Sequence, residues 1–300
     1  MLIDIDKITY NVGDGAAWVT FADRNIVIAD ILPEVNGVPV TEINHIAFCG
    51  CEQLQTVNIP NSVKWIGKSA FSDCISLKEI VLPNSINTIC VETFWGCKSL
   101  SKVIIPNSVA HISPRAFYEC ESLENIVIPD SVKIIGDEAF ENCKSLKSVV
   151  LPDSVEFIGG STFKGCKSLE SVIIPNSVTE ISDLLFSGCS SLEYIEIPDS
   201  VRKIGKYAFS SCHSLKKISI PNSVKTLRKF TFLSCSSLEI VELPYNINRI
   251  HSETFTDCEN VRKVVFSKKL PKRKNADKIF AQMFEAGLRT REVLLRIATL

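Results

Sequence analysis

Apolar positions return along the chain in a unit of 23 residues, and one copy shows how the unit is built. Residues 77–82 follow the spacing L-x-x-I-x-L, whose last three positions alternate as in a short β-strand. Pro83 ends this strand because proline removes a backbone donor, and the Asn-Ser pair after it is typical of a corner. The isoleucines of 86–89 predict a second extended leg, and a short helical turn is expected over 93–97.

The start of that helical turn is suggested by comparing the copies. The residue after the second leg is mostly glycine or serine: Gly67, Cys90, Ser113, Gly136, Gly159, Ser182, Gly205, Arg228 and His251. Both residue types are tolerated as helix N-caps, and Ser113 is followed by a proline, which favours the first helical position. Arg228 and His251 indicate that a left-handed backbone is not required at this position.

Cysteine keeps the register of the repeat without insertion or deletion through ten copies: Cys51, Cys74, Cys97, Cys120, Cys143, Cys166, Cys189, Cys212, Cys235 and Cys258. A phenylalanine precedes each of them by three residues. A fixed period of this length predicts a solenoid, in which a unit buries its apolar face only by stacking on its neighbours. We therefore expect one body of ten repeats over 43–266, with an N-terminal cap over 1–42 and a separate segment over 267–300.

Units such as Leu54–Cys74 and Leu123–Cys143 follow the pattern L-x-x-I-x-L-P-x-S-V-x-x-I-G-x-x-A-F-x-x-C. This pattern resembles the BspA-like class of leucine-rich repeats. The resemblance implies an α/β repeat solenoid that is curved and right-handed, with its parallel strands on the concave face. Residues 8–40 resemble the N-terminal module that precedes such repeats. The family is associated with adhesion and protein binding, and no catalytic residue set belongs to the repeat.

Composition excludes two classes of protein. The chain of 300 residues is 45% hydrophobic with a net charge of -1, which is too apolar and too weakly charged for a disordered protein. No run approaches the roughly 18 apolar residues of a membrane-spanning helix. The start at Met1 shows no basic region, long apolar region or cleavage site. We expect a cytoplasmic protein, or a secreted or surface protein if a signal peptide has been removed.

The regular cysteines have several interpretations. A metal site needs ligands gathered around one point, whereas this spacing distributes one thiol per turn, so no metal is expected. Stacked strands lie roughly 4.8 Å apart, which is within the range that a disulfide tolerates. Parallel Cβ directions, and turns expected to splay apart on the side away from the sheet, argue against bridges. We favour a column of reduced, buried thiols and leave a disulfide ladder as the alternative.

The outward strand positions predict a binding surface for a protein partner. Five consecutive copies are apolar and β-branched: Val81, Ile104, Val127, Val150 and Ile173. They would form a stripe roughly 20 Å long, continued by Glu196 and Glu242. Polar residues border it, among them Glu79, Lys102, Tyr194 and Lys217. The alternative is that valine and isoleucine simply suit strands.

The C-terminal part carries the opposite charge from the rest. Residues 262–300 hold 11 basic and three acidic side chains, a net of +8, which leaves 22 basic and 31 acidic, a net of -9, for residues 1–261. A basic patch is predicted at Lys268, Lys269, Lys272, Arg273 and Lys274, and it gives the alternative function, binding of an acidic polymer or an anionic membrane. Nucleic acid is not expected as a partner. Apolar spacing over 279–284 with Gly287 at the C-cap, and a second helix over 293–297, predict a helical cap.

Catalysis requires groups that converge. The four histidines, His45, His111, His213 and His251, occupy four different positions of the repeat. The recurrent serines follow proline at a corner, and no nucleophile, phosphate-loop, zinc or dinucleotide motif is present. We therefore predict no enzyme and no cofactor. The leading hypothesis is a protein-interaction scaffold, adhesin-like, whose partner and oligomeric state the sequence does not identify.

Overall fold

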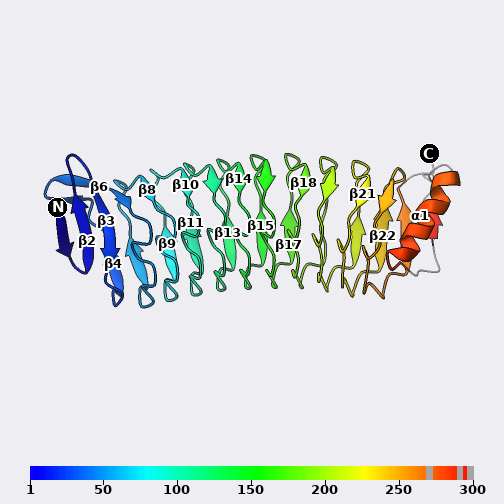
Figure 1. Cartoon of the computed structure of the whole chain (residues 1–300), viewed down its shortest axis with the longest axis horizontal. Coiled ribbons are helices and arrows are strands. Elements are labelled where there is room, and N and C mark those ends of the chain that lie inside the picture. Colours follow the sequence, from blue (N-terminus) through cyan, green and yellow to red (C-terminus); the bar gives the residue numbers. More distant parts are fainter. Residues whose placement is uncertain (268–272, 289–292, 296–300) are drawn as a thin grey trace.

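The computed structural model describes residues 1–267, 273–288 and 293–295. Turns of chain lie side by side along one long axis, with the N-terminal strands at one end and the helix α1 (Arg273–Glu285) at the other (Figure 1). Buried apolar side chains form one core cluster that extends from Ile8 to Leu288. The predicted solenoid of parallel strands is confirmed.

Most turns contribute two short strands, and the strands of neighbouring turns that pair do so in parallel with a shift of 23 residues, as Val127 with Val150 and Val150 with Ile173. The first leg of the turns consists of β7 (Thr56–Asn58), β9 (Glu79–Val81), β11 (Lys102–Ile104), β13 (Asn125–Val127), β15 (Ser148–Val150), β17 (Ser171–Ile173), β20 (Lys217–Ser219), β22 (Ile240–Leu243) and β24 (Lys263–Phe266). The second leg consists of β8 (Trp65–Ile66), β10 (Thr88–Ile89), β12 (His111–Ile112), β14 (Ile134–Ile135), β16 (Phe157–Ile158), β18 (Glu180–Ile181), β19 (Lys203–Ile204), β21 (Thr226–Leu227) and β23 (Arg249–Ile250). We call the outer surface of the first leg the sheet face.

The N-terminal residues form the strands on which the first turns stack. These are β1 (Leu2–Ile5), β2 (Ile8–Val12), β3 (Ala17–Ala22), β4 (Ile28–Asp30), β5 (Glu34–Val35) and β6 (Val38–Ile43). Strands β1, β2 and β3 are antiparallel, and β5 pairs antiparallel with β6. The parallel pairing begins where β6 lies between β3 and β8, and where β4 pairs with β7. Both legs of the solenoid therefore have a paired strand at this end.

The predicted helical turn after the second leg is wrong, because this segment is a series of tight turns. Two residues of each copy have a positive φ, for example 57° at Glu92 and 71° at Gly96, and a residue in this region interrupts an α-helix. In the same segment of the preceding copy, Phe71 N–H donates to Thr93 of the next turn at 2.9 Å, whereas Ser72 N–H donates to Ser69 at 3.2 Å. Successive backbone N–H groups thus donate alternately to a carbonyl of the next turn and to a carbonyl of the same turn. The described chain is a β-solenoid with one helix rather than an α/β fold.

Hydrogen bonds also join adjacent turns on the side of the tight turns, away from the sheet. Phenylalanine rings from Phe48 to Phe255 stack in one column, with centroid spacings from 5.0 Å for Phe48–Phe71 to 5.8 Å for Phe163–Phe186. These spacings are slightly wider than the separation of paired strands, roughly 4.8 Å. Adjacent turns are therefore held together on the side of the tight turns as well as on the sheet side.

Glycine at the end of the second leg has a role other than the predicted N-cap. Gly159 has no positive φ, but a Cβ there would lie 2.3 Å from the backbone nitrogen of Asp137 in the preceding turn. Gly159 N–H donates to Ile135 at 2.8 Å, which holds the two backbones at this distance. Close backbone approach explains the glycine at this position.

The C-terminal helix packs on the last turn. Ile279 and Met283 are buried, and Phe255 N–H donates to the carbonyl of Ala286 at 2.8 Å, where other turns donate to the next repeat. The helix ends as predicted at Gly287, whose φ is 101°, with Leu288 N–H donating to Met283. The predicted second helix is wrong, because β25 (Val293–Leu295) pairs in parallel with β24.

Candidate functional site

The apolar stripe, Val81, Ile104, Val127, Val150 and Ile173, lies on the sheet face as predicted. The exposed fractions of these residues are 56%, 45%, 80%, 62% and 63% in that order. Their strand neighbours alternate inward, since Ile126 and Val149 are buried at 6% and 2% exposure. Strand pairing places Val127, Val150 and Ile173 in direct register, so that their side chains form one continuous row.

Polar side chains border the stripe at the beginning of each strand. Glu79 and Lys102 form an exposed ion pair at 3.8 Å, which contributes little stability in water. Tyr194 is 59% exposed four turns further along, at the other end of the stripe. The predicted rim therefore borders the apolar row on one side with groups that remain solvated.

The first leg lacks a strand where the stripe ends. Residues 194–196 lie between β17 and β20 and form no strand, and one parallel bridge joins Glu196 to Ile173. A pocket of about 750 Å³ opens at this place. Five of the predicted site residues line it: Ile173, Tyr194, Glu196, Lys217 and Glu242. The structure therefore joins the end of the apolar stripe to a polar pocket, which we call the sheet pocket.

The sheet pocket has an acidic lining. Glu196, Asp199 and Glu242 face it together with one basic residue, Lys217. Lys217 Nζ lies 2.9 Å from a carboxylate oxygen of Glu242, so this ion pair crosses from one strand to the next. The remaining negative charge favours a basic group in the pocket.

Most of the cysteines pack in the core. All 12 are free thiols, and the ten in register are buried. Cys143 Sγ donates to the carbonyl of Phe117 at 3.2 Å, and Cys166 repeats the contact with Phe140 at 3.2 Å. Burial raises the pKa of the Cys51 thiol to about 11 and that of Cys212 to about 12. Neutral, enclosed thiols are poor nucleophiles in any compartment, so their free state does not indicate a cellular location.

The described residues contain no group of three or more histidine, cysteine or acidic side chains that could hold a metal ion. Two of the histidines have local structural contacts. His45 packs edge-on against Trp65 and accepts a hydrogen bond from the N–H of Lys68 at 2.8 Å. His213 Nδ1 lies 3.0 Å from the carbonyl of Ser234. No helix of the described chain is long and apolar enough to span a membrane.

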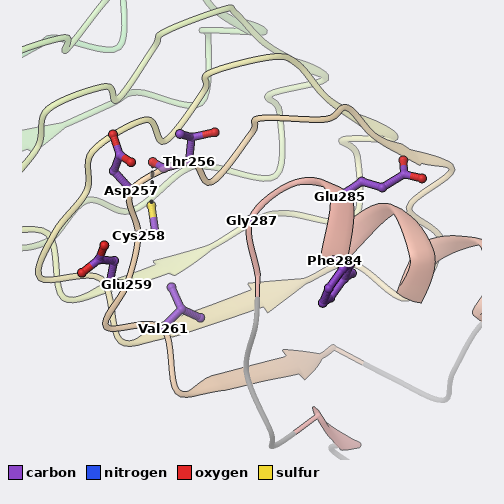
Figure 2. Close-up of a pocket in the computed structure, with 8 residues that line it drawn as sticks. All are labelled: Thr256, Asp257, Cys258, Glu259, Val261, Phe284, Glu285 and Gly287. Atoms are coloured by element: carbon purple, nitrogen blue, oxygen red, sulfur yellow. Dashed lines mark hydrogen bonds between the residues drawn. The ribbon is translucent and has the colours of Figure 1, made fainter.

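A second pocket lies between the last turn and the end of α1, with a volume of about 530 Å³. Figure 2 shows Asp257 and Glu259 on the loop of the turn, with Glu285 on the opposite side of the pocket. The three carboxylates do not converge on one point. Phe284 is 68% exposed at the rim, and Cys258 Sγ donates to Phe232 at 2.9 Å.

Three residues of the predicted basic patch, Lys268, Lys269 and Lys272, lie outside the part of the chain that the structure describes. The side chains of the other two, Arg273 and Lys274, are not described either. A different basic surface was not predicted. It is a pocket of about 560 Å³ on the second leg, which we call the basic groove, lined by Arg202, Lys203, Lys206, Lys225, Arg228 and Lys229 together with Thr226 and His251. The sequence contains a sign of this surface, because basic residues recur at one repeat distance. Lys225 follows Arg202, and Lys229 follows Lys206, by 23 residues.

Comparison with known proteins identifies the repeat. The family model described as BspA type leucine rich repeat region (6 copies) matches residues 41–170 and 157–283. A leucine-rich repeat protein from Bacteroides ovatus is 35% identical, with a TM-score of 0.82 over 88% of this chain and 70% of that chain. A leucine-rich repeat protein of T. pallidum is 30% identical, with a TM-score of 0.52 over 71% of this chain and 90% of that chain.

A leucine rich cell surface protein from Faecalibacterium prausnitzii shares the fold. It is 23% identical, with a TM-score of 0.54 over 96% of this chain and 98% of that chain. No curated protein matches the sequence of this chain. The similarity therefore identifies a family and a fold and gives no partner.

Proposed function

We propose that this chain, which belongs to the BspA-type leucine-rich repeat family, is a non-catalytic scaffold that binds a partner protein on its sheet face. Repeat solenoids bind partners on extended surfaces of this kind, and we take the sheet face to be the concave one. The proposal includes an adhesin-like role, in which the partner belongs to another cell or to a matrix.

One observation carries the proposal: the exposed apolar stripe leads directly into the sheet pocket. Val127, Val150 and Ile173 are more than half exposed, and Ile173 also lines the pocket. A solvated strand position needs no apolar residue, and a contiguous apolar surface with a polar rim is typical of an interaction site. The pocket adds a concavity that could hold an anchoring side chain.

The chemistry of this surface restricts the partner. The stripe is one side chain wide and spans five turns, roughly 20 Å, which suits an extended segment laid across the strands. Apolar side chains of the segment would lie on Val81 to Ile173. A lysine or arginine would enter the sheet pocket, where Glu196 and Asp199 accept its charge.

We also infer that α1 closes the C-terminal end of the core. Ala286 accepts the hydrogen bond of Phe255 N–H at 2.8 Å, and Gln282 Oε1 accepts that of Ile250 N–H at 3.0 Å. Both donors belong to the last turn and would otherwise lack the acceptor that a following turn provides. The terminal turn of a solenoid needs such a cover.

The test of partner binding is a pair of double variants within the same turns. Val127→Asp with Val150→Asp introduces two charges on the sheet face, and Ile134→Asp with Phe157→Asp introduces two charges on the second leg. Ile134 and Phe157 are also in register and are 40% and 52% exposed, so the control matches in spacing and charge. Partners captured from extracts of the source organism or its host are identified, purified and measured by biolayer interferometry.

We expect the sheet-face variant to lose binding by at least tenfold, because each carboxylate would be desolvated against an apolar partner. The second-leg variant is expected to bind as the wild type does. Unchanged binding by the sheet-face variant would refute the proposed surface. Equal loss in both variants would assign the effect to charge or folding rather than to this surface.

A further inference from the structure

The basic groove lies on the opposite leg of the solenoid from the apolar stripe and has no part in the function proposed above. Its walls come from β19, β21 and the tight turns that follow them. Six of its eight lining residues are lysine or arginine. Lys203, Lys206 and Lys229 are exposed, so their ammonium groups can reach a ligand in the groove.

Stacking places like charges next to each other in the groove. Arg202 and Lys225 occupy one position of the repeat and lie on adjacent turns, roughly 4.8 Å apart at the backbone. Other positions of the repeat place opposite charges together, as in the pairs Lys147–Glu124 at 2.8 Å and Lys216–Glu193 at 2.8 Å. The groove therefore departs from the charge pairing seen elsewhere on the solenoid.

The acidic residues beside the groove compensate only part of its charge. Lys203 pairs with Glu180, Lys229 lies 3.0 Å from Glu253, and Arg228 lies 4.0 Å from Asp183. Three carboxylates neutralise three of the six basic side chains, so three positive charges remain in the groove. Arg249 on the next turn is not included in this number. The excess occupies two turns of the solenoid and is thus concentrated in a small volume.

His251 reports the positive potential of the groove. Burial lowers the pKa of its imidazole, and the charges of Arg249, Lys229, Arg228 and Lys206 lower it further. Four cations from three successive turns act on one ring. An anion bound among them would oppose this effect and raise the pKa of His251.

We propose that the basic groove binds a compact ligand that carries several phosphate or sulfate ester groups. Guanidinium groups bind such oxyanions through two parallel hydrogen bonds, and ammonium groups add point charges. A volume of about 560 Å³ is in the range of small-molecule sites. The groove has no phenylalanine, tyrosine or tryptophan in its lining for base stacking, which favours a small polyanion over single-stranded nucleic acid.

A first readout is the titration of His251 by NMR, with the signal assigned by His251→Gln. Inositol hexakisphosphate serves as the phosphate probe. We expect the imidazole pKa of His251 to rise when the probe is added. An unchanged pKa of His251 at saturating probe would place the ligand elsewhere and refute the site.

The decisive experiment compares two double variants by isothermal titration calorimetry. Arg202→Gln with Lys225→Gln removes two charges from the groove. Lys64→Gln with Lys133→Gln removes two charges from the same position of other repeats, where both lysines are exposed. The probes are inositol hexakisphosphate and a heparin-derived hexasaccharide, with an oligothymidylate of similar charge for comparison.

We expect the groove variant to weaken binding at least tenfold and the control variant to change it less than twofold. Affinity should also fall between 50 and 200 mM salt, because several charges are neutralised in the complex. Binding of either polyanion supports the site, and the probe that binds shows whether the groove prefers phosphate or sulfate ester groups. The proposal is refuted by no binding of either probe at 1 mM, by equal weakening in both variants, or by tighter binding of the oligothymidylate.

Discussion

The phenylalanine column makes a quantitative prediction about Phe163→Ala. The Phe163 ring is fully buried, with centroids 5.7 Å from Phe140 and 5.8 Å from Phe186 at interplanar angles of 4°. Each stacked pair contributes about 0.5–1.5 kcal/mol beyond burial, and truncation of a core phenylalanine costs about 3–5 kcal/mol in total. Because two stacks and the core packing are lost together, we expect the free energy of unfolding to fall by about 4 kcal/mol.

The assay is urea unfolding followed by circular dichroism, with Phe157→Ala as the matched control. Phe157 belongs to the same turn but is 52% exposed, so its truncation should cost less than about 0.5 kcal/mol. Turns contact only their neighbours, and a weak central turn can therefore separate the transition into two steps. Equal midpoints for the two variants would refute the view that the ring column stabilises the stack.

Two further predictions concern the thiols. A thiol reagent should modify only the half-buried Cys49 and Cys90 in the native protein, and all 12 cysteines in denaturant without reductant; fewer than 12 would reveal disulfides. Burial raises the pKa of Cys51 to about 11 and of Cys212 to about 12, whereas unfolded thiols ionise near about 8.5. Above that pH the unfolded chain binds fewer protons than the native one. The unfolding free energy should therefore fall as the pH rises to about 12, by up to about 1.4 kcal/mol for each pH unit and each thiol. Urea unfolding midpoints at pH 7 and pH 10 measure this fall. If the double variant Cys51→Ala with Cys212→Ala lost stability equally steeply, the pH dependence could not be assigned to these two thiols.

Much of the fold could be predicted from the sequence because the repeat fixes which positions are inside. The alternation in residues 125–127 predicted that Ile126 is buried and that Val127 faces solvent, and both are confirmed. The tight turns could not be predicted in the same way. Residues such as Glu92 and Arg115 adopt a positive φ, which their residue types do not suggest, and the hydrogen bonds to the neighbouring turn stabilise that conformation.

The candidate sites differ in how far the sequence could reveal them. The stripe is a run of β-branched apolar residues at one repeat position, so its exposure follows from the strand pattern. The sheet pocket depends on the missing strand at residues 194–196, whose sequence Tyr-Ile-Glu keeps the normal alternation. The second C-terminal helix was expected from apolar spacing alone, but three residues pairing with β24 form a strand because a hydrogen-bonding edge is available there.

Because the turns stack in register, residues at the same outward repeat position form a column along the surface. The two proposed sites use different repeat positions and are therefore physically separate. The pairs Lys147–Glu124 and Lys216–Glu193 show a column in which opposite charges pair between adjacent turns. The stripe and the basic groove are columns of like residues, and they lie on different legs of the turn. Val127→Asp with Val150→Asp therefore leaves the groove intact, and Arg202→Gln with Lys225→Gln leaves the stripe intact. Each variant thus controls for the folding of the other, since loss of both binding activities in one variant indicates damage to the shared core.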